Sequence, residues 1–167
     1  MPVDTKHPDY EKHEFQWQKT RDAVRGTVEI KDKGKRHQYL PVPDAEANSE
    51  RLGVDTLRYR QYLKRALYTN FTGRTKSALV GAAFRREPSY ELPTALEYLI
   101  EDATGDGLGI VQMAKDELSN LLETGRALFL VDFPPTEEGL SQEDVTRLDL
   151  RASIIPYTAE QCVNWKT

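Results

Sequence analysis

A single basic stretch, residues 57–86, constrains what this chain can fold into and what it can contact. It has no Asp or Glu and contains eight basic residues: Arg58, Arg60, Lys64, Arg65, Arg74, Lys76, Arg85 and Arg86. The whole chain has 23 basic and 27 acidic residues, so the remainder holds 15 basic against 27 acidic residues. A segment of charge +8 within a remainder of −12 needs a partner. That partner is the acidic part of the same fold, an acidic neighbouring subunit, or a polyanion such as nucleic acid.

The periodicity of this stretch predicts two helices. The first has one apolar stripe with the basic residues beside it: Tyr59, Tyr62, Leu63, Ala66 and Leu67. Residues 69–73 interrupt the pattern with cap and turn formers, and a second helix is expected from near Arg74 to before Pro88. This helix should point Leu79, Val80, Ala83 and Phe84 inward. Its small residues (Ala78, Gly81, Ala82, Ala83) either admit a closely approaching partner or serve ordinary tight helix packing.

Length and composition restrict the class of protein. A chain of 167 residues is expected to form one domain, and 30% charged with 38% hydrophobic residues makes it polar for a globular protein. No apolar run approaches the roughly 18 residues of a membrane span, and the first 15 residues lack the apolar core of a secretory signal. The single cysteine, Cys162, excludes an internal disulfide and a site with several thiolate ligands.

Helices are also expected on either side of the basic stretch. One should begin at Asp9, carry Phe15 and Trp17 inward and end at Gly26. Residues 27–49 are rich in Lys, Asp, Gly and Pro, which indicates a mobile, exposed connection with a brief extended piece at 39–40. After the basic stretch, Thr94 begins a helix with Leu96, Leu99, Ile100 and Ala103 on its apolar side. A longer amphipathic helix then runs from Ile110 to a C-terminal cap at Gly125.

Two strands are predicted near the end of the chain. Residues 127–133 form a nearly continuous apolar run between Gly125 and Pro134, a pattern typical of a strand buried on both faces. Residues 150–157 form a second strand, which Pro156 assigns to a sheet edge. Few strands after many helices give an α+β fold, mostly helical with a small sheet.

The usual chemical constellations are missing. His7, His13 and His37 lack metal-binding spacing and are expected to be solvated. The glycine-rich loop 105–109 follows a helix rather than a strand, so we expect a helix–helix turn instead of a nucleotide site. Adjacent acidic pairs such as Asp116-Glu117 are expected on solvated faces, and Cys162 has no local partner to lower its pKa. The sequence therefore predicts neither an enzyme nor a cofactor or metal site.

The basic stretch remains the candidate site. Tyrosines are interleaved with basic residues at Tyr59, Tyr62 and Tyr68. Arginine and tyrosine together can bind nucleic acid, through phosphate contacts and base stacking. The same two residue types are also enriched at subunit interfaces. The candidate contact residues are Arg58, Arg65, Arg74, Lys76, Arg85 and Arg86. From residue types alone, a protein interface, a nucleic-acid surface and a solvated face all stay open.

Short sequence motifs along most of the chain resemble the N-terminal wing region of the portal proteins of tailed bacteriophages. Within and after the basic stretch they are YLKRALYTN (62–70), TGRT (72–75), LVG (79–81), FRR (84–86), LP (92–93), LEYL (96–99) and GL (107–108). They continue in TGRA (124–127), LVDFP (130–134), IIPY (154–157), AE (159–160) and VNW (163–165), and MPVD (1–4), HP (7–8) and Trp17 also fit. Residues 31–52 carry no such resemblance.

The resemblance implies a structural virion protein without catalytic residues. Such proteins form a head-to-tail connector, a homo-oligomeric ring of about twelve subunits at one capsid vertex, assembled in the host cytoplasm. Viral DNA passes through the ring during packaging and ejection, and the partners are the packaging ATPase (terminase), the capsid protein and tail adaptor proteins. No membrane is implied. Residues 1–52 are then an N-terminal helix with a flexible connection, and residues 53–167 are part of a wing domain, expected to be incomplete at its C-terminal end.

Within this resemblance, the arginines acquire a specific hypothesis. Each subunit of a ring presents different faces to its two neighbours. We expect Arg58, Arg65, Arg74 and Arg86 to pair largely with acids of the adjacent subunit or of the same wing. The acidic balance of the rest of the chain motivates this hypothesis, because a channel of negative charge repels DNA phosphates and lets DNA slide. The alternative is a small nucleic-acid-binding module that uses residues 57–86.

Overall fold

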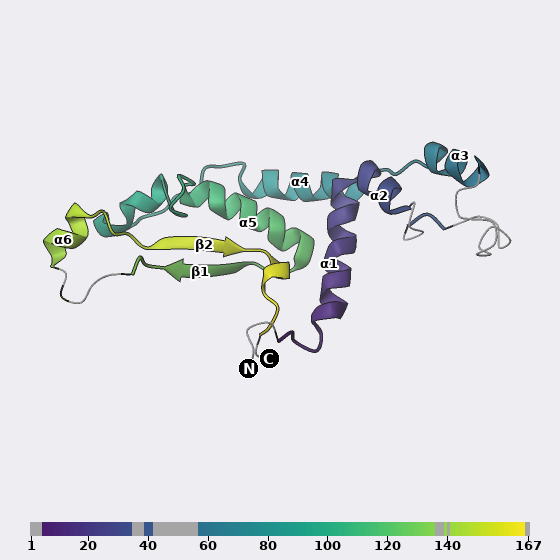
Figure 1. Cartoon of the computed structure of the whole chain (residues 1–167). Coiled ribbons are helices and arrows are strands. Elements are labelled where there is room, and N and C mark those ends of the chain that lie inside the picture. The colour runs from purple at the N-terminus through teal and green to yellow at the C-terminus, as the bar shows by residue number, and fades with distance from the viewer. Residues whose placement is uncertain (1–4, 35–38, 42–56, 136–138, 140, 166–167) are drawn as a thin grey trace.

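The computed structural model describes residues 5–34, 39–41, 57–135, 139 and 141–165. These residues form an elongated molecule in which helices lie along one side of a small sheet (Figure 1). The α-helices are α1 Tyr10–Arg25, α2 Thr27–Gly34, α3 Leu57–Arg65, α4 Phe71–Ala83, α5 Ile110–Thr124 and α6 Gln142–Arg147, with 3₁₀ helices η2 Thr94–Ile100 and η3 Ala159–Gln161. The strands are β1 Leu128–Asp132 and β2 Ser153–Tyr157. The predicted α+β, mostly helical fold is confirmed.

Helix α1 follows its sequence signals at both ends. Asp9 occupies the N-cap position, although its side chain makes no capping bond, and Gly26 ends the helix with φ 92°, a conformation that glycine adopts without strain. Trp17 is buried, as predicted, whereas Phe15 is 52% exposed and the prediction that it points inward is wrong. The helix lies against α4 and α5. Its buried Tyr10 and Trp17 form the first core with Ala159 of η3, and Val163 and Trp165 pack against them.

The connection after α1 begins as a helix, so the prediction of a mobile link from residue 27 is wrong for residues 27–34. The reason is a buried carboxylate. Asp22 of α1 is 1% exposed, and it accepts hydrogen bonds from Lys33 Nζ at 2.5 Å and from the Tyr39 hydroxyl at 2.6 Å. Burial, together with this carboxylate, raises the pKa of Tyr39. These bonds fold α2 back onto α1. Residues 39–40 form a bend rather than the expected extended piece, and residues 35–38, with His37, and 42–49 lie outside the described residues.

The predicted helices of the basic stretch are α3 and α4. Tyr59 is buried on α3, but the helix ends at Arg65, and Leu67 is 94% exposed beyond it, against the prediction. Helix α4 starts at Phe71, three residues earlier than expected, and buries Val80. Leu79 and Ala83 are exposed rather than inward, as are the small residues Ala78, Gly81 and Ala82. A Cβ at Gly81 would have no heavy atom of another described element within 4 Å, so these residues do not serve tight helix packing within the described part of the chain.

The helices α5 and η2 form the second core with β2. Leu99, Ala103 and Met113 are buried together, and Ile154 of β2 packs against them. The glycine-rich turn between η2 and α5 is a helix–helix turn, as predicted, because Asp102 Oδ1 accepts bonds from the Gly105 and Gly107 amides at 2.7 and 2.9 Å. Gly125 ends α5 in the left-handed conformation at φ 72°, which confirms the predicted cap.

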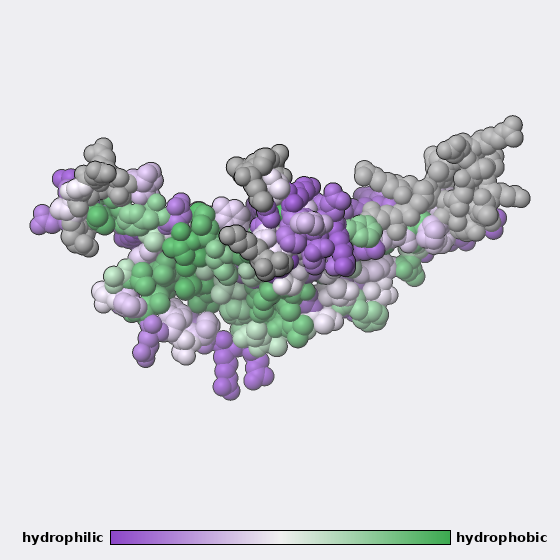
Figure 2. Space-filling model, turned by 90° about the horizontal axis from the view of Figure 1, so that it is seen from below, coloured by the Kyte–Doolittle hydropathy of each residue, from purple (hydrophilic) through white to green (hydrophobic). Residues whose placement is uncertain are grey.

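The two predicted strands pair antiparallel, with Leu130 opposite Ile155 at the centre of the ladder. The prediction that the first strand is buried on both faces is wrong. Phe129, Leu130 and Val131 are 51%, 47% and 69% exposed, because β2 is the one strand that pairs with β1 in the described chain. Figure 2 shows a continuous hydrophobic surface over this sheet. The two-stranded sheet is stabilised by the packing of β2 against η2 and α5 rather than by a third strand.

The described ends of the chain meet in an aromatic cluster. His7 donates its backbone N–H to the Val163 carbonyl at 2.9 Å, and its ring stacks on Trp165 at 4.1 Å. On the same indole lies the Arg126 guanidinium, 3.9 Å from the ring centroid. His13 stacks on Trp17 at 5.7 Å. The prediction of solvated histidines is therefore wrong for these two, since only 13% of the His7 side chain is exposed.

Candidate subunit or nucleic-acid interface

Helix α3 presents four cations within nine residues. Arg58, Arg60, Lys64 and Arg65 are all exposed, and the helix contains no acid. Arg58 and Arg65 are seven residues apart and share one face, because seven residues make about two helical turns. The Arg65 guanidinium donates to the Gln61 carbonyl within the same helix at 3.4 Å and makes no ion pair with another described residue. Helix α3 therefore carries a concentrated positive charge at one end of the molecule (Figure 1).

Three arginines and one lysine follow on α4 and its C-terminal end. Arg74, Arg85 and Arg86 are exposed and form no ion pair with a residue that the structure describes. Lys76 differs, because its Nζ lies 2.5 Å from Glu123 Oε1 of α5 and its side chain is only 21% exposed. Lys76 thus pairs within the chain, across the contact between α4 and α5, and its role as a contact residue stays a prediction.

Lys76 belongs to an ionic network that joins four elements. Glu123, 10% exposed, also accepts from Arg21 Nη1 of α1 at 2.8 Å. Arg21 binds the Glu160 carboxylate of η3 through Nε and, at 2.9 Å, through Nη2. Hydrogen bonding to Arg21 holds the pKa of Glu160 below its ordinary 4.5. Residue spacing held no signal for this network, because its members are separated by up to 139 positions.

Asn70 fixes the start of α4 against the end of α1. Its Oδ1 accepts from the Gly73 amide at 2.7 Å, and its Nδ2 donates to the Val24 carbonyl at 2.7 Å. Glycine is required at position 73 because a Cβ there would lie 2.8 Å from Val24 O. Asn70, one of the cap formers that the sequence indicated at 69–73, therefore also orients α4 relative to α1.

The tyrosines of the basic stretch face inward. Tyr59 is 3% exposed and donates its hydroxyl to the Leu40 carbonyl at 2.7 Å, and burial raises its pKa. Tyr68 donates to the Ala23 carbonyl at 2.9 Å, and Tyr62 is half-buried with its ring 6.1 Å from that of Tyr59. Stacking on bases needs exposed ring faces, so this geometry disfavours a single-strand stacking platform built on these tyrosines.

An acidic segment follows the basic one, and the sequence reading above missed it. Residues 87–114 contain no Lys or Arg and hold six acids: Glu87, Glu91, Glu97, Glu101, Asp102 and Asp106. All except the half-buried Asp102 are exposed. The segment runs away from α4 to η2 and the turn before α5, at the opposite end of the molecule from α3 (Figure 1). The described chain is therefore electrically polar along its length.

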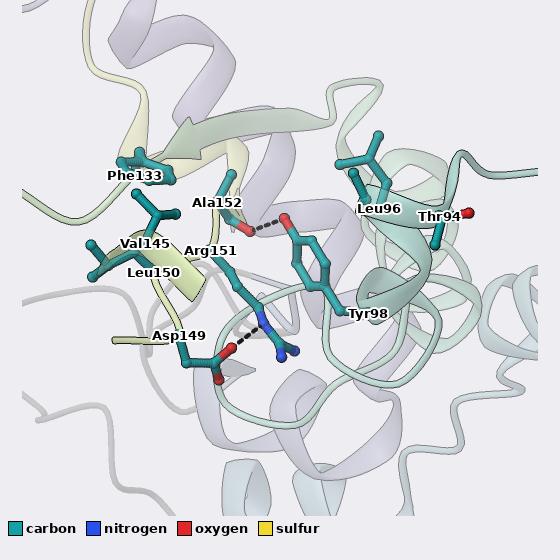
Figure 3. A pocket seen from close by; sticks show the side chains of 10 residues that line it. Thr94, Leu96, Tyr98, Phe133, Val145, Asp149, Leu150, Arg151 and Ala152 are labelled. Atoms are coloured by element: carbon teal, nitrogen blue, oxygen red, sulfur yellow. Dashed lines mark hydrogen bonds and ion pairs between the residues drawn. The ribbon is translucent and has the colours of Figure 1, made fainter. Parts of the chain in front are cut away.

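A cleft of about 480 Å³ opens at the acidic end. Figure 3 shows its apolar side chains, contributed by η2, the end of β1, α6 and the segment before β2: Leu96, Tyr98, Phe133, Val145 and Leu150. Tyr98 is fixed because its hydroxyl donates to the Ala152 carbonyl at 2.8 Å. Arg151 lies over the Tyr98 ring at 5.2 Å and pairs with Asp149 at 2.5 Å. This is a wide depression of mixed character, with apolar side chains on one part of its wall and Thr94 and the Arg151–Asp149 pair on another.

No group of three or more His, Cys, Asp or Glu side chains in the described chain is placed to hold a metal ion. Among the described helices, none is long and apolar enough to cross a membrane. No family model matches the sequence, and no curated protein is significantly similar to it.

Proposed function

We propose that this chain is a structural subunit of a homo-oligomeric ring, the portal through which the DNA of a tailed bacteriophage is packaged and ejected. The resemblance of short sequence motifs in this chain to those of portal proteins supports the proposal. The observation that carries it in the structure is the separation of charge: Arg74, Arg85 and Arg86 are exposed without an ion-pair partner in the described chain, and acids 87–106 lie beyond them.

Opposite charge at the two ends favours contact between unlike faces of successive copies. Such a heterologous contact generates a ring when the rotation between copies closes. Arg58 and Arg65 of α3 would then meet the acidic segment of the next subunit, and Arg74 and Arg86 would extend the same face. The packaging ATPase, the capsid protein and the tail adaptors are the further partners that this function implies, and the virion is the place where it acts.

Charge reversal tests the ring. Replacing Arg74 and Arg86 with Glu should abolish rings in native mass spectrometry, because like charges would face one another across the contact. The matched control reverses Lys12 and Arg25, two exposed cations of α1, and changes the net charge by the same amount. Rings that survive the Arg74 and Arg86 reversal would reject the interface assignment, and a chain that stays monomeric at all concentrations would reject the ring.

The second candidate is a nucleic-acid-binding module. It is favoured by the four exposed cations of α3, which occupy one short helix that itself contains no acid. This function predicts tight binding of duplex DNA that weakens steeply with salt, with a slope of about 0.9 per phosphate contact. Removing the charges of Arg58 and Arg65 should lower the slope. A flat binding curve at low salt would eliminate this candidate.

A further inference from the structure

We propose that Leu67 of one copy inserts into the cleft at the acidic end of the next copy, so that the ring contact has an apolar anchor as well as paired charges. The inference rests on the proposed homo-oligomeric function and names the residues through which it works. The cleft is the one of about 480 Å³ walled by η2, α6 and the segment before β2.

Leu67 is displayed as an anchor. Its side chain is 94% exposed, although its neighbours Ala66 and Tyr68 are half-buried. The linker between α3 and α4 that carries Leu67 is held after this residue by the Tyr68 hydroxyl on the Ala23 carbonyl at 2.9 Å and by Asn70 on the Val24 carbonyl at 2.7 Å. Before Leu67, the Ala66 amide donates to the Tyr62 carbonyl at 2.9 Å. Because the backbone around Leu67 is already fixed, docking of its side chain requires little further ordering of the chain, which is a property of an interface anchor.

The cleft matches this anchor in chemistry. Leu96, Phe133, Val145 and Leu150 provide apolar walls (Figure 3), and a volume of about 480 Å³ has room for a leucine together with part of its flanking chain. Docking in such walls removes the apolar surface of the leucine from water, which favours the contact. Without an occupant, these apolar walls stay in contact with water.

Charge complementarity selects a second copy as the occupant. Leu67 lies between Lys64 and Arg65 on one side and Arg74 on the other, all exposed. The elements that wall the cleft carry exposed Glu97 on η2 and Glu143 on α6. The cations there, Arg151 and Arg147, pair with Asp149 and Asp144, so Glu97 and Glu143 leave this region with a negative charge. Docking the linker therefore brings cations toward acids as the apolar side chain enters. The linker and the cleft lie at opposite ends of the molecule (Figure 1), so one chain cannot fill its own cleft.

Cross-linking tests the contact. In a Cys162→Ser background, Leu67→Cys combined with Leu96→Cys should give a ladder of dimers, trimers and larger species on oxidation, read by non-reducing electrophoresis. A mixture of the two single-cysteine chains should stop at dimers, because each carries one end of the contact. The matched control places the first cysteine at Val28, which is 71% exposed on α2, and should give no ladder. Absence of the ladder from the Leu67 pair would overturn the inference.

Leu67→Asp provides the second measurement. Because Leu67 is 94% exposed, this variant should keep the unfolding midpoint of the parent while its self-association weakens at least tenfold in sedimentation velocity, and Val28→Asp should change neither. Rings that persist unchanged in Leu67→Asp would overturn the anchor and leave the ring function standing. A cysteine ladder in a protein that forms open chains but no closed rings would support the anchor and overturn the portal function.

Discussion

Replacing Arg21 with methionine should lower the free energy of unfolding by about 2–3 kcal/mol, because the change removes the centre of the network that joins α1, α5 and η3. Methionine keeps most of the apolar stem and deletes the charge. Three charge-assisted hydrogen bonds are lost, two to Glu160 and one to Glu123.

The magnitude follows from how far each group is removed from water. The side chains of Arg21, Glu123 and Glu160 are 17%, 10% and 31% exposed. Exposed pairs contribute roughly 0–1 kcal/mol, whereas removing one partner of a fully buried pair costs roughly 3–5 kcal/mol. This network lies between those limits. Lys76 remains on Glu123 at 2.5 Å and limits the damage there, so we place the loss at about 2–3 kcal/mol. The melting temperature should fall by roughly 4–12 °C.

Urea denaturation followed by circular dichroism measures the change, and the double-mutant cycle with Glu160→Gln isolates the Arg21–Glu160 coupling. Arg147→Met is the matched control, because Arg147 also pairs with a carboxylate, Asp144 at 2.6 Å, but its side chain is 75% exposed. The control should leave the midpoint unchanged. An Arg21→Met midpoint indistinguishable from that of Arg147→Met would refute the reasoning that burial makes this network stabilising.

Two further changes test the same assembly of helices. Because Arg21 lowers the pKa of Glu160 below 4.5, the stability that Glu160 contributes should be present above pH 4.5 and lost as the pH falls through the lowered pKa. Glu160→Gln should remove this part of the pH dependence of the urea midpoint. A pH profile unchanged by this variant would contradict the role of Glu160. Asn70→Ala should lower the free energy of unfolding by about 1–3 kcal/mol, since it deletes the α4 cap and the bond to Val24. The exposed control Ser77→Ala should leave it unchanged in the same urea assay. Equal midpoints for the two variants would contradict a stabilising role of Asn70 between α1 and α4.

Elements whose signals are local were predictable. Gly26 and Gly125 end α1 and α5 where the chain needs a positive φ. The interruption at residues 69–73 separates α3 from α4, and the apolar runs give the two strands. These features depend on residues within a few positions of one another, so propensity and periodicity are enough to find them. The concentration of cations on α3 is likewise a property of nine consecutive residues.

The fate of individual side chains was less predictable. Phe129 and Val131 have the pattern of a strand buried on both faces, yet they are exposed, because burial depends on which elements lie beside the strand. Lys76 has the same local setting as Arg74, but α5 places Glu123 within 2.5 Å of it. Glu117 belongs to an adjacent acidic pair expected on a solvated face, yet it is 6% exposed on the inner side of α5.

The sequence by itself determined the helix and strand boundaries set by caps and breakers, the α+β composition, and a chain with one strongly basic segment followed by an acidic one. Only the tertiary structure decided which cations stay exposed, which side chains enter the network around Arg21, and that the linker with Leu67 and the apolar cleft lie at opposite ends. The physical reason is range: backbone conformation is selected by neighbours a few residues away, whereas burial and ion pairing are selected by whichever distant segment the folded chain brings alongside.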